Sequence, residues 1–269
     1  MDKRIGFIGC GNMAQAIIKG MVEAKVAAPE DIMASAMSEE TLHHVQESLN
    51  IQVTKRNSEV AEYSDILFLA VKPNQYASII AEIEALIKET TIIVTIAAGI
   101  DLKFMEQTFG RKIKAIRTMP NTPSLVGEGM SAICANEYVT DDDLKAVLKL
   151  FESFGKAEVI DESLMDAIPA ISGSSPAYVY MFIESLADGG VKQGIPREQA
   201  YKLAAQAVLG AAKMVLETDL HPGALKDQVC SPGGATIEAV TALEKNNFRG
   251  SILSAMESCT KKAKGLSEE

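Results

Sequence analysis

The sequence is poor in the residues that build several common kinds of catalytic site. Its 269 residues include no tryptophan and only three histidines, His43, His44 and His221. Multi-histidine metal sites and most histidine-relay hydrolases are therefore disfavoured. We expect no metal site in this protein.

Cysteine is also scarce, and its spacing excludes two further classes of protein. The four cysteines, at positions 10, 134, 230 and 259, form no CxxC pair and have no histidine nearby. This spacing is neither a zinc pattern nor a dense disulfide framework. Reduced thiols in a cytoplasmic protein fit this usage, so we predict a cytoplasmic location.

Positive charge and long hydrophobic runs are in short supply as well. Acidic residues outnumber basic ones by 36 to 26, and the net charge of −10 disfavours broad binding to nucleic acid or anionic membranes. The longest uncharged stretch, residues 167–183, contains two prolines, one glycine and three serines, so it is a poor membrane span. The apolar N-terminal stretch is interrupted by glycines, which argues against a signal peptide.

What the chain does have is an alternation of strand and helix patterns over its first 160 residues. The wholly apolar run 66–71 and a second run typical of a buried strand, 91–97, alternate with runs of helical spacing such as residues 12–24. This order predicts an α/β fold, with a Rossmann-type parallel sheet domain over residues 1–161. Thr140 and Asp143 form a Thr-x-x-Asp box, which predicts a helix start and not a metal site.

After residue 161 the β pattern ends, and helical patterns interrupted by glycine and proline take over. We predict helices at residues 176–193, 196–217, 235–245 and 250–264. The helices over 176–217 are apolar on more than one face, so they need burial on several sides. About 110 residues of helix cannot supply that burial alone. We therefore predict an all-helical dimerisation domain over residues 162–269, in a homo-oligomer.

A glycine-rich stretch after the first predicted strand indicates a dinucleotide site. Gly9, Gly11 and Ala14 form the pattern G-x-G-x-x-A between a predicted strand and a predicted helix. The first glycine permits a tight turn, the second lets the backbone approach a pyrophosphate, and the alanine lets the helix pack closely on the sheet. The phosphates then bind to free N–H groups at the helix N-terminus.

The end of the second predicted strand bears on the choice of cofactor. It lacks the acid that usually binds the ribose of NAD. Ser35 and Ser38 are suited to bind a 2′-phosphate, and Arg56 can reach it from the next loop, which favours NADPH over NADH. The alternative is that the serines only cap a helix and that either cofactor binds.

A second glycine-rich turn lies in the helical half of the chain. Gly233 and Gly234 leave backbone N–H groups uncovered before the helix that starts at Ala235, which forms a seat for a small carboxylate. Ser231 and Thr236 add hydroxyl groups beside it. Taken alone, this pattern is more typical of a plain turn between helices, with Ser231 as the cap.

Five motifs in order resemble those of the pyrroline-5-carboxylate reductase family. They are residues 8–14 (IGCGNMA), 70–73 (AVKP), 97–99 (AAG), 119–123 (MPNTP) and 227–236 (DQVCSPGGAT). The resemblance covers essentially the whole chain. It implies an oxidoreductase that reduces 1-pyrroline-5-carboxylate to L-proline, the last step of proline biosynthesis, by hydride transfer from NADPH or NADH. It also implies a helical domain interleaved with a second subunit, and dimers that assemble further, commonly to decamers.

The resemblance also implies which residues form the site. Thr236 lies beside the ring nitrogen and is the catalytic candidate. Asp219 and Gln228 stand where some family members have a glutamate and an asparagine. The residues implied to hold the substrate carboxylate are Ser231, Gly233, Gly234, Ala235 and Thr236. The residues implied to bind the cofactor are Ile8, Gly9, Cys10, Gly11, Asn12, Met13, Ser35, Asn57, Ala70, Val71, Lys72, Pro73 and Ala98.

The chemistry of imine reduction suits a site without a strong acid. Solvent can protonate a cyclic imine near neutral pH, so the protein mainly needs to align the nicotinamide with the imine carbon. Two other functions compete with this one: a 3-hydroxyacid-type dehydrogenase of similar architecture, and a non-catalytic NADP-binding regulator. Such dehydrogenases typically have a Lys-x-x-x-Asn pair early in the second domain, but residues 170–181 contain neither Lys nor Asn. The intact segment 231–236 argues against the regulator.

Overall fold

The structure, a computed structural model, describes residues 3–268, and these divide into two compact units. The first unit runs to Ser174 and also takes in the segment from Cys259 to the C-terminal end of the last helix, while the second unit is Ser175–Ser258. In the sequence, the strand pattern gives way to a helical pattern at Asp161, before the boundary between the units. The short helices η5 (Glu162–Ala167) and η6 (Pro169–Gly173) lie between these two points. Both of these short helices contact strand β7 of the first unit.

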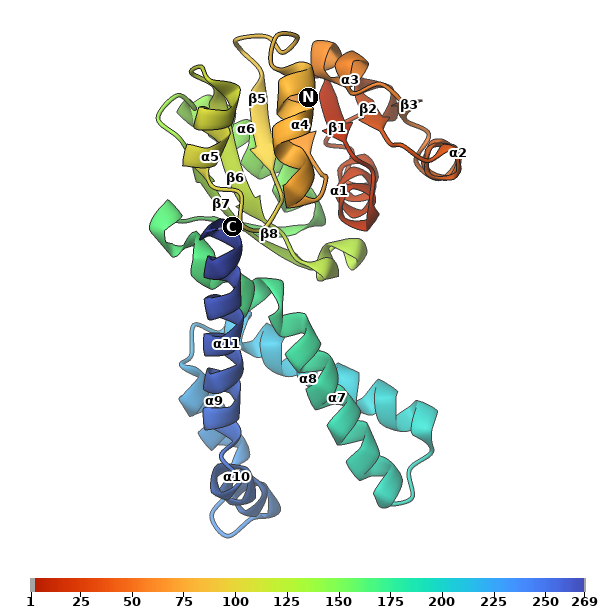
Figure 1. Cartoon of the computed structure of the whole chain (residues 1–269). Coiled ribbons are helices and arrows are strands. Elements are labelled where there is room, and N and C mark those ends of the chain that lie inside the picture. The colour runs from red at the N-terminus through yellow and green to blue at the C-terminus, as the bar shows by residue number, and fades with distance from the viewer. Residues whose placement is uncertain (1–2, 269) are drawn as a thin grey trace. The chain divides into compact units, whose positions relative to one another are not determined.

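The first unit is built on an eight-stranded sheet with the order β3-β2-β1-β4-β5-β6-β7-β8 (Figure 1). The strands are β1 (Ile5–Ile8), β2 (Ile32–Ser35), β3 (Gln52–Thr54), β4 (Ile66–Leu69), β5 (Ile92–Thr95), β6 (Lys114–Met119), β7 (Gly129–Ala135) and β8 (Gly155–Val159). The prediction of a Rossmann-type sheet followed by a helical region is confirmed, with one departure. Strands β6 and β7 pair antiparallel, because the short helix η3 (Thr122–Val126) joins them, whereas a parallel pair needs a long crossover.

Helices cover both faces of this sheet (Figure 1). They are α1 (Asn12–Glu23), α2 (Glu39–Leu49), α3 (Asn57–Tyr63), α4 (Tyr76–Ile83), α5 (Leu102–Phe109) and α6 (Asp141–Phe151), with the short turns η1 (Pro29–Asp31), η2 (Pro73–Gln75) and η4 (Glu152–Phe154). The predicted capping box is confirmed, since the side chains of Thr140 and Asp143 each accept from the other's backbone N–H. Helix α3 is absent from the predictions because its seven residues are too few to show a clear period.

Three strands that are buried along their whole length explain why helices are needed on both sides of the sheet. Every residue of β1, β4 and β5 is buried, and successive side chains point to opposite faces of a sheet. On one face Phe7 stacks on Phe68 with ring centroids 4.5 Å apart, and Phe151 of α6 packs beside them. On the other face Tyr76 and Ile80 of α4 join the core. This double burial fixes the position of the strand ends that carry the site.

The second unit contains α7 (Ser175–Lys192), α8 (Arg197–Glu217), α9 (Pro222–Val229), α10 (Ala235–Lys245) and the first half of α11 (Phe248–Glu268). Among the described residues of α7 and α8, the buried ones are Ala187, Ala200 and Ala204. Large apolar side chains stay exposed on the same helices, including Met181 at 67% and Leu216 at 80%. Such an apolar surface is typical of a protein–protein interface. In the described part of the chain, no helix is long and apolar enough to cross a membrane.

Candidate functional site

The glycine-rich turn between β1 and α1 has the backbone that the sequence predicts. Gly9 has φ +90°, and a Cβ atom on it would lie 2.5 Å from the carbonyl oxygen of Ala70 and 2.7 Å from Cγ1 of Val71. Only glycine fits both the conformation and the space. A Cβ atom on Gly11, the N-cap of α1, would meet no atom within 4 Å among the described residues. The second glycine therefore leaves open space in front of the first turn of α1.

The start of α1 is free to bind an anion. The N–H groups in the first turn of a helix have no partner inside the helix. Within the described residues no side chain caps α1 either, so these N–H groups can bind a ligand. Asn12 and Met13 belong to this turn. N–H groups of this kind, together with the positive end of the helix dipole, favour a phosphate.

Backbone hydrogen bonds bring together three of the predicted cofactor segments. The N–H of Ala70 donates to the carbonyl of Ile8 at 2.8 Å, and the N–H of Gly9 donates to the carbonyl of Ser35 at 3.1 Å. The ends of β4, β1 and β2 thus meet at one edge of the sheet. Lys72 and Pro73 are exposed just beyond β4. In open α/β sheets, ligands bind at this carboxyl edge.

Ser35 and Asn57, two of the residues implied to bind the cofactor, contact each other. Ser35 is 1% exposed, and its hydroxyl donates to Oδ1 of Asn57 at 2.8 Å. The amide Nδ2 of Asn57 donates in turn to Oε2 of Glu82 at 2.9 Å. Ser38 accepts a hydrogen bond from the N–H of Thr41 and caps α2. Ser38 therefore caps a helix, as the alternative interpretation expects, whereas Ser35 bonds the side chain of Asn57.

Tyr76 is a structural residue that no motif in the sequence indicates. Its buried hydroxyl donates to the carbonyl of Leu69 at 2.6 Å and lies 2.8 Å from Oγ1 of Thr95. The same Thr95 oxygen accepts from the N–H of Ala97. Burial raises the pKa of Tyr76 above its usual range, so the side chain stays neutral. Tyr76 therefore ties the segment after β4 to the loop after β5 that carries Ala98.

Cys10 lies inside the glycine-rich turn but has no reactive character. It is 3% exposed, and burial raises the pKa of its thiol to about 12. The thiolate is the reactive form of cysteine. The contribution of Cys10 to the turn comes from its backbone, since its carbonyl accepts from Nε2 of Gln15 at 2.9 Å.

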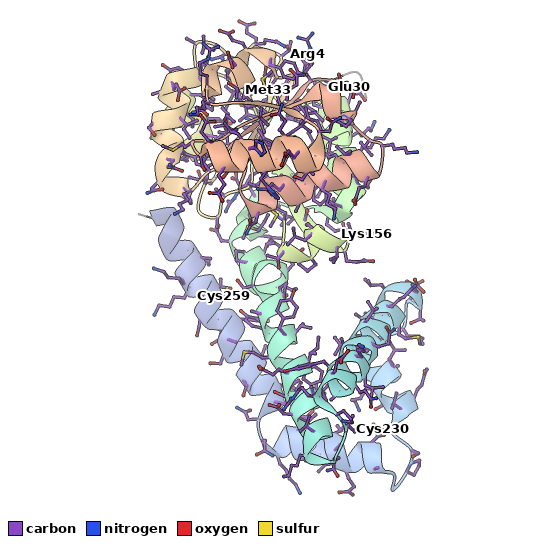
Figure 2. The ribbon with its side chains drawn as sticks, turned by 90° about the vertical axis from the view of Figure 1, so that its right-hand side faces the viewer. Arg4, Glu30, Met33, Lys156, Cys230 and Cys259 are labelled. Carbon is purple, nitrogen blue, oxygen red and sulfur yellow. The ribbon has the colours of Figure 1, made fainter. Side chains whose placement is uncertain are left out.

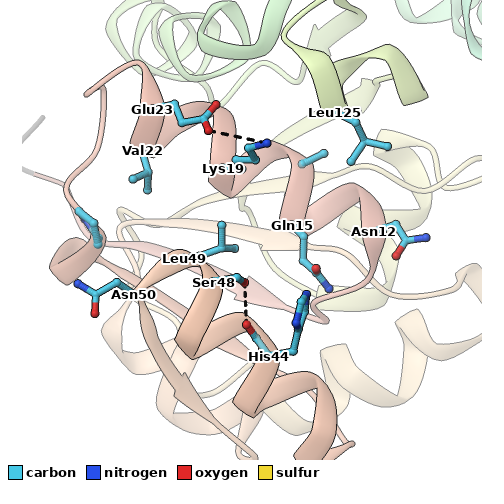
Figure 3. A pocket seen from close by; sticks show the side chains of 12 residues that line it. Asn12, Gln15, Lys19, Val22, Glu23, His44, Ser48, Leu49, Asn50 and Leu125 are labelled. Atoms are coloured by element: carbon cyan, nitrogen blue, oxygen red, sulfur yellow. Dashed lines mark hydrogen bonds and ion pairs between the residues drawn. The ribbon is translucent and has the colours of Figure 1, made fainter.

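A groove of about 670 Å³ lies between α1 and α2 (Figure 3). Its walls include Gln15 and Lys19 of α1, His44 of α2 and Leu125 of η3. Of the described lining residues, Asn12 is the one that belongs to the predicted cofactor site. The groove therefore reaches the glycine-rich turn only at the first residue of α1.

The predicted substrate segment forms a tight turn before α10. The N–H of Gly234 donates to the carbonyl of Ser231 at 3.0 Å, with Pro232 and Gly233 between them. Gly233 has φ +69°, and the order Pro-Gly at these central positions is typical of a type II turn. Gly234, and not Ser231, is the N-cap of α10.

Gly234, the N-cap of α10, leaves room for the hydroxyl of Ser231. A Cβ atom on Gly234 would lie 2.3 Å from Oγ of Ser231, so only glycine lets this hydroxyl lie against the helix start. In the described structure no side chain caps α10, which leaves the N–H groups of its first turn open beside Thr236. Cys230 immediately precedes the turn (Figure 2).

The predicted site residues thus form two groups, one in each unit. The group in the first unit comprises residues 8–13, Ser35, Asn57, residues 70–73 and Ala98, and the group in the second comprises residues 231–236. Asp219, at φ +52°, lies in the loop between α8 and α9. His221 accepts from the N–H of Gly223 at 3.0 Å and caps α9.

Comparison with known proteins gives matches over nearly the whole chain. Residues 162–266 match the family model described as pyrroline-5-carboxylate reductase dimerisation, and residues 4–99 match the model described as NADP oxidoreductase coenzyme F420-dependent. The chain is 47% identical over 268 residues to pyrroline-5-carboxylate reductase of Escherichia coli strain K12, covering 100% of both chains.

Two solved structures are similar over the same length. Pyrroline carboxylate reductase of Plasmodium falciparum, solved with NADP bound, is 35% identical with a TM-score of 0.90, and the match covers 99% of this chain and 98% of that one. Pyrroline-5-carboxylate reductase of Coxiella burnetii is 33% identical with a TM-score of 0.92, and the match covers 99% of both chains.

Proposed function

Because this chain belongs to the pyrroline-5-carboxylate reductase family, we propose that it reduces 1-pyrroline-5-carboxylate to L-proline with NADPH, the last step of proline biosynthesis. One observation carries this proposal. Two helices of the chain, α1 and α10, each follow a glycine-containing turn and have no side-chain cap among the described residues. One suits a dinucleotide pyrophosphate and the other suits a small carboxylate. NADH is the alternative cofactor.

The residues of the first unit fit a dinucleotide. The open space at Gly11 and the free N–H groups of Asn12 and Met13 would hold its pyrophosphate. When bound, the cofactor supplies the hydride. Residues 70–73 and Ala98 follow the ends of β4 and β5 that Tyr76 joins, and they would flank its ribose and nicotinamide.

The residues of the second unit would hold and polarise the substrate. The N–H groups around Gly234 and Ala235 would bind the carboxylate, with the hydroxyl of Ser231 beside them. The hydroxyl of Thr236 would hydrogen-bond the ring nitrogen, which solvent protonates. The protein would thereby orient an imine that is already a good hydride acceptor, and a strong catalytic acid is not required.

We infer that the two domains have separate roles. Residues 1–161 bind the dinucleotide, and residues 162–269 bind the substrate and a second copy of the chain. The exposed apolar side chains of α7 and α8 support a homo-oligomer. We propose that dimers assemble further, to a larger oligomer such as a decamer in the cytoplasm, which native mass spectrometry would report directly. A monomer in that measurement would contradict the assembly.

The decisive assay follows the oxidation of NADPH after addition of pyrroline-5-carboxylate, with a 3-oxo acid as the competing substrate. Turnover of the imine alone supports the reductase, and turnover of the oxo acid would select the hydroxyacid dehydrogenase. Tight NADP binding without turnover of either would select the regulator.

The role of Thr236 is tested by Thr236→Ala, which should lower kcat about 10- to 100-fold because it removes one preorganised hydrogen-bonding partner of the ring nitrogen. The matched control is Thr241→Ala on the same helix, where the hydroxyl only donates to the carbonyl of Ile237. A Thr236→Ala variant with unchanged kcat and KM would remove that role and leave the reductase itself standing.

A further inference from the structure

The segment between β4 and α4 is closed at its base by one side chain. Leu69 is the last residue of β4 and Tyr76 is the first residue of α4, with residues 70–75 between them. The phenol hydroxyl of Tyr76 donates to the carbonyl of Leu69 at 2.6 Å. The segment that carries the predicted cofactor residues 70–73 therefore begins and ends at one hydrogen bond.

The same hydroxyl reaches the neighbouring strand. Leu69 and Thr95 are the last residues of β4 and β5, and they are paired in register. The hydroxyl oxygens of Tyr76 and Thr95 are 2.8 Å apart. Because the one hydrogen of the phenol is donated to Leu69, the hydroxyl of Thr95 is the donor in this second bond. Tyr76 therefore bridges the two strands at the point where their pairing ends.

The hydrogen bonds continue into the loop after β5. Oγ1 of Thr95 accepts from the N–H of Ala97 at 3.3 Å, and Ala98 follows directly. The N–H groups of Ile96 and Ala97 also face the phenol oxygen, where they oppose the rise of its pKa that burial causes. The bonds thus run in one direction, from Ala97 through Thr95 and Tyr76 to the end of β4. Each bond in such a chain polarises and strengthens the next.

This bridge is buried, whereas the loops above it are open. Tyr76 and Thr95 are each 0% exposed, and the carbonyl of Thr95 accepts from the hydroxyl of Thr118 of β6 at 2.9 Å. Residues 71–74 and Ala98 are partly or largely exposed. A buried, hydrogen-bonded group of this kind fixes the positions of the groups that its neighbours present to a ligand. Tyr76 therefore acts through the two loops and not by direct contact with a ligand.

We propose that Tyr76 is a positioning residue for hydride transfer, because its hydroxyl sets the spacing between the loops after β4 and β5 and thereby the position of the nicotinamide. The inference rests on the proposed function in that residues 70–73 and Ala98 flank the nicotinamide. The pyrophosphate is bound elsewhere, at the Gly9 turn, so a change in the spacing affects the rate more than the affinity. A misplacement of about 1 Å can lower the rate of a reaction about 100-fold.

Tyr76→Phe tests this directly, since it removes the hydroxyl and keeps the ring in the core. It should lower the single-turnover rate of NADPH oxidation by pyrroline-5-carboxylate about 10-fold and leave the dissociation constant of NADP⁺ within about twofold. The rate is measured at a temperature at which the variant is fully folded. The matched control is Tyr63→Phe before the start of β4, where the hydroxyl donates to the carbonyl of Glu30 at 3.1 Å. The control should change neither quantity.

Thr95 gives a second test of the same bridge. Thr95→Val keeps the shape of the side chain and should lower the rate about 10-fold, whereas the conservative Thr95→Ser keeps the hydroxyl and should restore most of it. The double variant Tyr76→Phe, Thr95→Val should be about as slow as the slower single variant, because both changes break one chain. Losses that multiply to about 100-fold would contradict a single bridge.

Bound NADPH provides a readout that needs no turnover. The circular dichroism of its nicotinamide absorption band depends on the orientation of the ring, so it should change in Tyr76→Phe and stay the same in Tyr63→Phe. If the chain does not reduce pyrroline-5-carboxylate, this change would uphold the inference while the proposed function fails.

Two results would overturn the inference. The first is a Tyr76→Phe variant that unfolds at a lower temperature but keeps the rate and the dichroism of the unaltered chain, which would show that the hydroxyl serves stability alone. The second is a variant that loses NADP⁺ affinity about 10-fold and keeps the rate at saturation, which would assign the hydroxyl to cofactor binding.

Discussion

Gly9 lies so close to the carbonyl oxygen of Ala70 that a Cβ atom on it would be 2.5 Å from that oxygen. The contact joins the turn after β1 to the segment after β4, which are 61 residues apart in the chain (70 − 9). Real Cβ atoms do not approach a carbonyl oxygen this closely, so the backbone itself would have to move. Gly11, two residues later, faces open space. The two glycines of this motif therefore have different roles. Gly9 permits close packing within the fold, and Gly11 leaves space for a ligand.

This difference predicts opposite outcomes for two matched substitutions. Gly9→Ala should lower the free energy of unfolding by about 2–4 kcal/mol, because it adds a positive-φ penalty to a backbone clash. Gly11→Ala should leave stability within about 1 kcal/mol and abolish dinucleotide binding, because its methyl group occupies the open space. Chemical denaturation and calorimetry with NADP⁺ measure the two effects. Equal stability of the two variants would contradict the assignment.

Asp143 predicts how stability depends on acid. Its carboxylate accepts from Nζ of Lys114 at 2.6 Å and from the hydroxyl of Thr140 at 2.7 Å. Burial alone would raise the pKa of Asp143, but these hydrogen bonds lower it below its ordinary value. A lowered folded-state pKa means that the stabilisation is present at neutral pH and is lost as the pH falls through that pKa.

Asp143→Asn should therefore reduce the free energy of unfolding by about 1–3 kcal/mol at pH 7. The difference from the unaltered chain should shrink below about pH 4, where the carboxyl group becomes protonated. Denaturant titrations across this pH range provide the measurement. Asp142→Asn is the control, because this neighbouring side chain is 95% exposed and should cost little. A deficit that stays constant down to pH 2 would refute the electrostatic origin.

Cys10 should resist alkylation although it sits in the cofactor turn. With a pKa of about 12, only about one thiol in ten thousand is ionised at pH 8. Cys230 is partly exposed and should react first. Brief iodoacetamide treatment followed by peptide mass spectrometry reports the order, and a urea-unfolded sample confirms that every thiol can react. Labelling of Cys10 as fast as Cys230 would contradict the buried, protonated thiol.

Both glycine turns could be predicted from the sequence because each depends on backbone geometry within a few residues. Gly9 and Gly233 have positive φ, Gly234 leaves room for the hydroxyl of Ser231, and Gly11 leaves open space before α1. The capping box at Thr140 is equally local. The wholly apolar run 66–71, which forms β4, likewise indicated a sheet covered on both faces.

The partners of the site residues could not be predicted in this way. The hydrogen bond from Ser35 to Asn57, the link from Tyr76 to Leu69 and Thr95, and the antiparallel β7 all depend on which strands become neighbours. No periodicity in the sequence encodes the pairing of Lys55 with Glu39.

The sequence by itself determined that this chain has a dinucleotide turn, a second anion-binding turn and helices that need a partner, because those properties reside in local composition and backbone freedom. Only the tertiary structure decided that the hydroxyl of Ser35 bonds the side chain of Asn57 and that Tyr76 joins the ends of β4 and β5. Side chains acquire such roles when the sheet brings the ends of distant strands within hydrogen-bonding distance.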